Sequence, residues 1–94
     1  MLFEWDENKN RINRKTHHIS FEYAARVWND EKRLVDFDDE HSTGTELRWH
    51  AIGLVDKVIV VVYIEKSADL VRLISARKAT REECNEYYRN YESR

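Results

Sequence analysis

An apolar run at residues 57–65, with the sequence KVIVVVYIE, constrains the fold more than any other part of the chain. Its β-branched residues favour a strand, and a strand that is apolar at nearly every position is typical of one covered on both faces. We therefore expect residues 57–65 to form the central strand of a small sheet.

The rest of the chain predicts the order β-α-α-β-β-β-β-α. The expected strands are 2–5, 33–37, 47–54, 57–65 and 70–77, and the expected helices are 7–15, 21–29 and one that begins after residue 80. Consecutive strands with short connections pair antiparallel. The fold class is therefore α+β, with helices grouped on one side of an antiparallel sheet. At 94 residues, without proline or internal repeat, the chain fits a single domain that spans 1–94.

Three side chains are placed to begin these helices. Asp6 and Ser20 precede the first and second expected helices and can accept hydrogen bonds from first-turn N–H groups. Thr80 and Glu83 have the spacing of a capping box, in which each side chain bonds the main-chain N–H of the other. In the first helix, Ile12 is the only candidate that faces the core.

Composition favours a folded cytoplasmic protein. The formal net charge is −2 although 36% of residues are charged, which argues against a simple cationic nucleic-acid binder but not against a local basic site. A single cysteine, Cys84, allows no disulfide within the chain and suits a reducing compartment. We expect no secretory signal, and the longest apolar run is too short to span a membrane.

Arginines in an otherwise apolar strand are the first candidates for a site. Residues 65–81 hold five cations, Lys66, Arg72, Arg77, Lys78 and Arg81, against two acids, Glu65 and Asp69. In one pairing register of the last two strands Arg72 shares a face with Glu65, and in the other Arg77 does. In either register we expect one arginine to lie close to Glu65.

Two interpretations of this pairing remain open. A Glu–Arg pair on an open sheet surface is often structural and stabilises only weakly. Alternatively, the planar fork of arginine matches phosphate oxygens, so the segment could bind an anion. The local excess of positive charge supports the second interpretation.

Other kinds of site have little support. His17 and His18 are adjacent, and His41 and His50 belong to a loop and a strand, so no metal-ligand spacing exists. A glycine-rich phosphate loop is also missing from the sequence. We expect neither a metal nor a cofactor, and we expect Cys84 to pack as a small apolar residue.

Several segments in the same order resemble the BrnT family of bacterial toxins. They are FEWDENKNRINRKTHHISFEYAARVW at 3–28, RWHAIG at 48–53, VVVYIEK at 60–66 and VRLISARKAT at 71–80. There are departures: His18 stands where the family usually has glycine, and Thr16 separates Lys15 from His17. Ile64 and Lys66 replace a threonine and an arginine often found around the glutamate.

The resemblance implies a small twisted antiparallel sheet packed against helices, similar to RelE-type toxins. It also implies metal-independent RNA cleavage that inhibits translation and growth. The expected partners are RNA and a BrnA-like antitoxin with a ribbon-helix-helix domain. Toxin and antitoxin would form a heterotetramer that binds operator DNA through the antitoxin.

Metal-free cleavage uses the ribose 2′-hydroxyl as nucleophile and needs a base, an acid and cations for the phosphorane. We expect Arg72 and Arg77 to supply the cations, Glu65 to be the base, and His17 to be the acid or an alternative base. The expected RNA-backbone contacts are Lys9, Lys15, Arg48, Lys66, Lys78 and Arg81. The alternative function is a non-catalytic module, or degenerate toxin, that binds nucleic acid or antitoxin without cutting.

Overall fold

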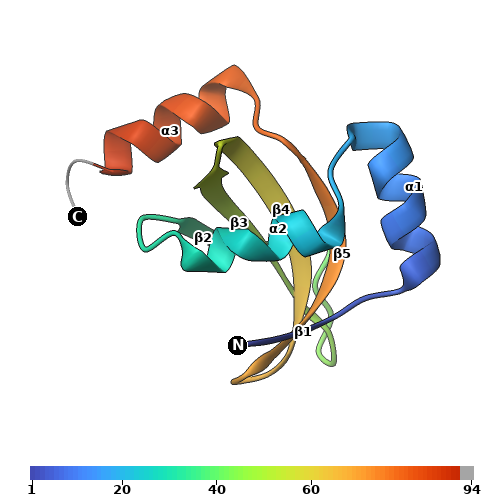
Figure 1. Ribbon diagram of the computed structural model, residues 1–94. Helices are drawn as coiled ribbons and strands as arrows, with labels where there is room; N and C mark the ends of the chain where they lie inside the picture. The colour runs from blue at the N-terminus through green and yellow to red at the C-terminus, as the bar shows by residue number, and fades with distance from the viewer. Residues whose placement is uncertain (92–94) are drawn as a thin grey trace.

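The computed structural model describes residues 1–91 (Figure 1). Its elements are β1 (Leu2–Glu4), α1 (Glu7–His17), α2 (Phe21–Ala24), the 3-10 helix η1 (Ala25–Asn29), β2 (Leu34–Phe37), β3 (Leu47–Val55), β4 (Lys57–Ser67), β5 (Leu70–Lys78) and α3 (Arg81–Tyr91). Within residues 1–91 no helix is long and apolar enough to cross a membrane.

The five strands form one sheet in the order β1-β5-β4-β3-β2, so β4 is central, as the sequence predicts. Strands β2 to β5 pair antiparallel in chain order. The edge strand β1 instead runs parallel to β5, with Leu2 opposite Leu70 and Glu4 opposite Arg72. The sheet is therefore mixed, and the antiparallel prediction holds for four of its five strands.

Helices cover both faces of the sheet, so the prediction that they group on one side is wrong. On one face, which we call the α2 face, Ala51, Ile59 and Val61 pack against α2 and η1. On the other, the α3 face, alternate residues Ile52, Val58 and Val60 pack against Tyr87 of α3. The apolar run in β4 is buried on both sides because each face has its own core. In Figure 1, α2 and η1 cross in front of the strands and α3 lies over one end of the sheet.

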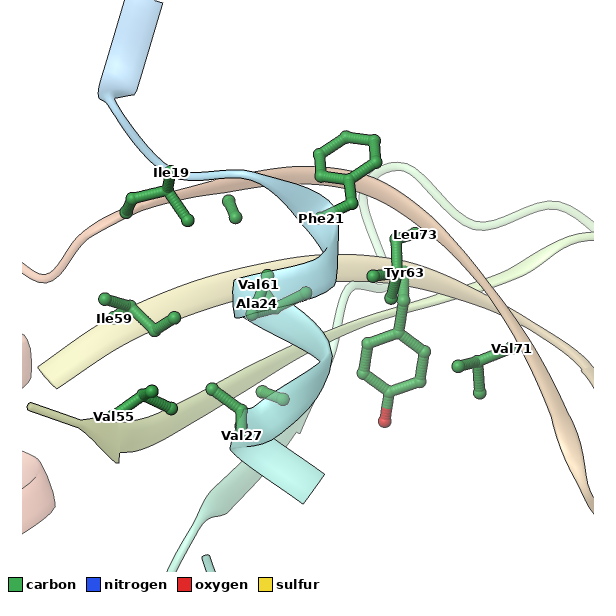
Figure 2. Close-up of a cluster of buried hydrophobic side chains, with 12 residues drawn as sticks. Ile19, Phe21, Ala24, Val27, Val55, Ile59, Val61, Tyr63, Val71 and Leu73 are labelled. Carbon is green, nitrogen blue, oxygen red and sulfur yellow. The ribbon is translucent and has the colours of Figure 1, made fainter. Parts of the chain in front are cut away.

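The α2 face carries the larger core. Figure 2 shows two groups of side chains in one cluster. The segment 19–27 contributes Ile19, Phe21, Ala24 and Val27, and the strands contribute Val55, Ile59, Val61, Tyr63, Val71 and Leu73. The expected helix at 21–29 is divided into one α-helical turn and the 3-10 helix η1. Here η1 approaches β3 so closely that a Cβ built on Gly53 would lie 2.7 Å from Cγ1 of Val27. Glycine therefore permits this contact.

Each expected cap is present. Oδ1 of Asp6 accepts from the N–H of Asn8 at 2.8 Å, and Oγ of Ser20 accepts from the N–H of Tyr23 at 3.0 Å. Thr80 and Glu83 form the reciprocal capping box, with bonds of 2.8 and 3.2 Å. His18 ends α1 in the left-handed conformation with φ 61°. Glycine adopts that conformation at least cost, which gives a physical reason for the glycine expected there from the resemblance.

Two buried asparagines, rather than Ile12, attach α1 to the domain. Ile12 is 49% exposed, so the prediction that it faces the core is wrong. The Asn13 amide donates to the carbonyls of Ile19 and Ala76 and accepts from the Ala76 N–H, at 2.8, 2.9 and 3.1 Å. Asn10 accepts from the N–H of Phe21 and is fully buried. Polar side chains are therefore internal on this helix because each meets main-chain groups that lack a partner: Asn13 at the edge of β5, and Asn10 at the first N–H of α2.

We expect Asn13→Ala to lower the free energy of unfolding by about 2–4 kcal/mol, because it leaves buried main-chain groups of Ala76 and Ile19 without partners. Urea denaturation followed by circular dichroism measures the loss. Ile12→Ala on the same helix is the matched control and should change stability by less than about 0.5 kcal/mol. A larger loss from Ile12→Ala than from Asn13→Ala would contradict this account of α1.

Candidate functional site on the α3 face

An extra residue in β5 decides which face its arginines occupy. Tyr63 pairs with Leu73 but Val62 pairs with Ser75, so Ile74 has no partner and forms a bulge. Arg72 lies opposite Ile64, and Arg77 lies opposite Val60. Side chains of paired strand residues point to the same face, and both β4 partners belong to the α3 face. The bulge therefore brings Arg72 and Arg77 to one face, although strict alternation would separate them.

Glu65 is on the opposite face from both arginines. It pairs with Val71, whose side chain belongs to the core of the α2 face. The expectation that one arginine lies close to Glu65 is therefore wrong. Arg72 instead bonds Glu4 of β1 at 3.0 Å, and Arg77 bonds Glu83 of α3.

The Arg77–Glu83 pair connects the end of β5 to the first turn of α3. Both terminal nitrogens of Arg77 donate to the Glu83 carboxylate, at 2.8 and 2.9 Å. These hydrogen bonds outweigh the effect of burial and lower the pKa of Glu83 from 4.5 to about 2, and the same pair raises the pKa of Arg77. Because Glu83 also caps the Thr80 N–H, the guanidinium of Arg77 has a structural role in holding α3.

Beyond α3 the face is open. Ile52, Val58 and Val60 are buried beneath the helix. His50, Val62 and Ser75, which pair across the next row, are only half-buried. The row after that runs Glu4–Arg72–Ile64–Arg48 across the sheet. This row gives the open face two guanidiniums on an apolar floor.

Arg48 has no carboxylate within ion-pair distance among residues 1–91, unlike the other two arginines of this face. Its Nε is buried without a hydrogen-bond partner. The backbone of Arg48 is fixed by Ser42, whose Oγ accepts from the Arg48 N–H at 2.8 Å and donates to its carbonyl. A positioned guanidinium with unused donors can bind an anion such as phosphate.

A groove of about 250 Å³ between α1 and β5 extends the open face. It is lined by Lys9, Ile12, Asn13, Thr16, His17, Ile74 and Ser75. Two of the sequence-predicted residues, Lys9 and His17, thus lie beside the bulge of β5. Ser75 belongs both to this groove and to the half-buried row, so the groove and the arginine face are continuous.

The remaining expected cations are more dispersed. Lys15 is exposed on α1, Lys66 near the end of β4, and Arg81 at the start of α3. Lys78 pairs with Ile59 and so belongs to the α2 face at the end of β5. The structure therefore does not gather all the expected RNA-binding residues into one surface.

A histidine–aspartate cluster at the edge of the open face was not found by sequence reasoning. Nε2 of His50 lies 3.1 Å from Oδ2 of Asp38, whose side chain is only 8% exposed. His41 bonds the same carboxylate through Nδ1 at 3.0 Å. Burial acts to raise the pKa of Asp38, but hydrogen bonds from the His41 main chain and from both imidazoles outweigh it and lower that pKa.

One signal in the sequence could have located this cluster. If the pairing of β2 with β3 continues for two residues beyond Asp36–His50, Asp38 comes opposite Arg48 and returns to the face of His50.

Within the described part of the chain, no group of three or more His, Cys, Asp or Glu side chains is arranged to hold a metal ion.

We expect Glu83→Gln to destabilise the protein by about 1–2 kcal/mol at pH 6. The substitution removes the charge that pairs with Arg77 but keeps an oxygen that can cap the Thr80 N–H. Solvent contact with the ion pair limits the loss. The lowered pKa of Glu83 means that this stabilisation is present above pH 4.5 and declines as the pH falls towards 2. Urea denaturation at pH 6 and pH 3 should therefore give a smaller difference from wild type at pH 3. Glu82→Gln, an exposed neighbour, is the control. Equal differences at both pH values would contradict the assignment.

Comparison with protein families matches residues 5–83 to the family described as "Ribonuclease toxin, BrnT, of type II toxin-antitoxin system". The fold is similar to the crystal structure of the Brucella abortus ribonuclease toxin BrnT, with a TM-score of 0.62 and 21% identity over 86% of this chain and 100% of that chain. At this identity the likeness shows the fold alone. Comparison with curated proteins gave no match. The family match covers most of the chain, which therefore belongs to the BrnT family of ribonuclease toxins of type II toxin–antitoxin systems.

Proposed function

We propose that this toxin cuts RNA on the open part of its α3 face, without a metal ion and with the ribose 2′-hydroxyl as nucleophile. The observation that carries the proposal is the bulge at Ile74, through which Arg72 and Arg77 share a face with Arg48. Three guanidiniums on one half-open sheet surface attract a phosphodiester backbone although the whole chain is acidic.

The arginines have different roles in this proposal. Arg48 and Arg72 bind the scissile phosphate and stabilise the charge that develops on its oxygens. Arg77 holds α3 through Glu83 and contributes positive charge to the face. Lys9 and His17 bind the RNA along the adjoining groove, where His17 is a candidate proton donor. Glu65 is not included as the base, because its side chain belongs to the other face of the sheet.

The dispersed lysines and Arg81 extend RNA binding beyond the site. Lys66 continues the open face at the end of β4. Lys15 and Arg81 are exposed on α1 and α3, and Lys78 is exposed on the α2 face at the end of β5. Each phosphate that such a cation neutralises releases counterions and adds salt-dependent affinity. We assign these residues to binding and not to the chemical step.

The family also supports an antitoxin partner. We propose a BrnA-like antitoxin with a ribbon-helix-helix domain, which inhibits the toxin and binds operator DNA as part of a heterotetramer. Both proteins then act in the cytoplasm, where the RNA is. The finer identity of this partner rests on family membership.

A non-catalytic binding module is the second candidate. It is favoured by the carboxylates that already bond Arg72 and Arg77, since such pairs can be wholly structural. A degenerate toxin of this kind would bind RNA or antitoxin on the same face and leave the RNA intact.

Arg72→Ala and Glu4→Ala separate the two candidates because the two residues form one ion pair. If Arg72 binds phosphate, Arg72→Ala should slow cleavage of single-stranded RNA by about 10²-fold or more, while Glu4→Ala should cut at a rate within about threefold of wild type. Cleavage is followed with a labelled mixed-sequence oligonucleotide, and folding is checked by thermal denaturation. Equal losses from both substitutions would mean that only the ion pair matters.

The same assay tests the proposed chemistry. We expect EDTA to leave the rate unchanged and an oligonucleotide with 2′-O-methyl groups to resist cleavage, because its nucleophile is blocked. Loss of activity in EDTA that Mg²⁺ restores would refute metal independence. Folded wild-type protein that leaves all RNA intact would favour the binding module.

A further inference from the structure

We propose that His50, oriented by Asp38, is the base that takes the proton from the ribose 2′-hydroxyl in this site. This inference rests on the proposed ribonuclease function and adds a catalytic residue to it. His50 belongs to the open α3 face, because it pairs with Val62, which pairs with Ser75. Arg48 lies two residues before His50 on β3, so its side chain is on the same face. A phosphate bound by Arg48 is therefore next to this imidazole.

The hydrogen bonds of His50 leave one ring nitrogen available. Nε2 is directed at Oδ2 of Asp38, 3.1 Å away, and Nδ1 has no hydrogen-bond partner among residues 1–91. The side chain is 35% exposed, so a ligand on the sheet can reach it. A carboxylate on one nitrogen fixes the ring and its tautomer, with Nε2 protonated and Nδ1 free to accept a proton.

The charged groups around His50 suit this role. On β2, Asp36 is its direct cross-strand neighbour and Asp38 bonds it. The neighbour of His50 on β4 is the apolar Val62, and the next residue across, on β5, is Ser75. Helix α3 packs on β3 at Ile52, the next residue of that strand on the same face. The acidic groups stabilise the imidazolium that forms, and Arg48 is the one cation on the same strand face.

A purely structural role for the His50–Asp38 bond is less well supported. Asp38 is already bonded by the main chain and the ring of His41, at 3.0 Å each. The loop is fixed a second time by Ser42, which bonds both main-chain groups of Arg48. The loop thus has its anchors without His50, whereas His50 obtains a fixed orientation only from Asp38.

The proposed chemical step needs no metal ion. Nδ1 of His50 takes the 2′-hydroxyl proton while the 2′-oxygen forms a bond to phosphorus. The bond from phosphorus to the 5′-oxygen then breaks, and the leaving oxygen takes a proton from His17, the candidate donor of the adjoining groove. Solvent afterwards takes the proton from His50 and returns one to His17. The products are a 2′,3′-cyclic phosphate and a 5′-hydroxyl end. Asp38 is a positioning residue, since it acts only through His50.

His50→Gln is the central test, because glutamine can still donate a hydrogen bond to Asp38 but cannot act as a base. We expect it to slow single-turnover cleavage of the mixed-sequence RNA oligonucleotide by about 10²-fold or more, the usual contribution of a general base. Affinity for the 2′-O-methyl oligonucleotide should stay within about threefold of wild type, because the phosphate contacts remain. His41→Ala is the matched control: it removes an imidazole from the same carboxylate, but one that is 61% exposed in the loop.

The rate–pH profile adds a readout that a structural role would not change. Wild type and His41→Ala should share a rising limb in the range where an imidazole titrates, and His50→Gln should lose it. Asp38→Asn should keep the limb but lower the plateau rate, because the ring of His50 loses the carboxylate that orients it. If wild type cuts RNA and His50→Gln cuts equally fast with the same profile, the role of His50 is refuted and the proposed function stands. If folded wild type does not cut, both are refuted.

Discussion

The bulge at Ile74 is the constraint on which the candidate site depends. Arg72 and Arg77 are five residues apart, so a regular strand would direct them to opposite faces. Because Ile74 is unpaired, the alternation shifts by one residue and both arginine side chains lie on the α3 face. Immediately beyond it, Asn13 of α1 bonds the N–H and the carbonyl of Ala76, where β5 no longer has β1 beside it. The irregular strand is thus held by a side-chain amide that takes the place of a neighbouring strand, and the same contact positions the groove of α1.

The two faces of the sheet differ in how far they are covered: the α2 face is a closed core, and the α3 face is partly open. The α2 face is closed by aromatic and aliphatic side chains, with Trp28 packed edge-on between Phe3 and Tyr63. The α3 face is closed only where the last helix lies, and the pair Arg77–Glu83 fixes that helix at its first turn. Stability therefore comes mainly from one face, and the other can expose cations beside a hydrophobic floor. This division explains how an acidic chain can carry a local site for a polyanion.

The sequence was sufficient for the features with local causes. The central strand, the strand order from β2 to β5 and the capping box at Thr80 follow from periodicity and spacing, and the structure confirms them. Ile12 was wrongly placed in the core, because Asn13 bonds the edge of β5 and Asn10 bonds the start of α2, and neither contact has a signal in α1 itself. The prediction that one arginine lies close to Glu65 was wrong, because the bulge at Ile74 moves Arg77 to the other face and leaves the composition of the strand unchanged. The link from Asp38 to His50 spans a loop, and its geometry depends on the register of β2.

Which face binds RNA is the central question, and an NMR titration of the labelled protein with 2′-O-methyl RNA answers it most directly. This ligand keeps the phosphates but cannot be cut, so the complex persists during the measurement. We expect the largest shifts at Arg48, His50 and Arg72, together with the residues that line the α1 groove, and small shifts on the α2 face. Shifts that centre instead on Glu65 and its neighbours on the α2 face would contradict the account, because the three guanidiniums would then be structural.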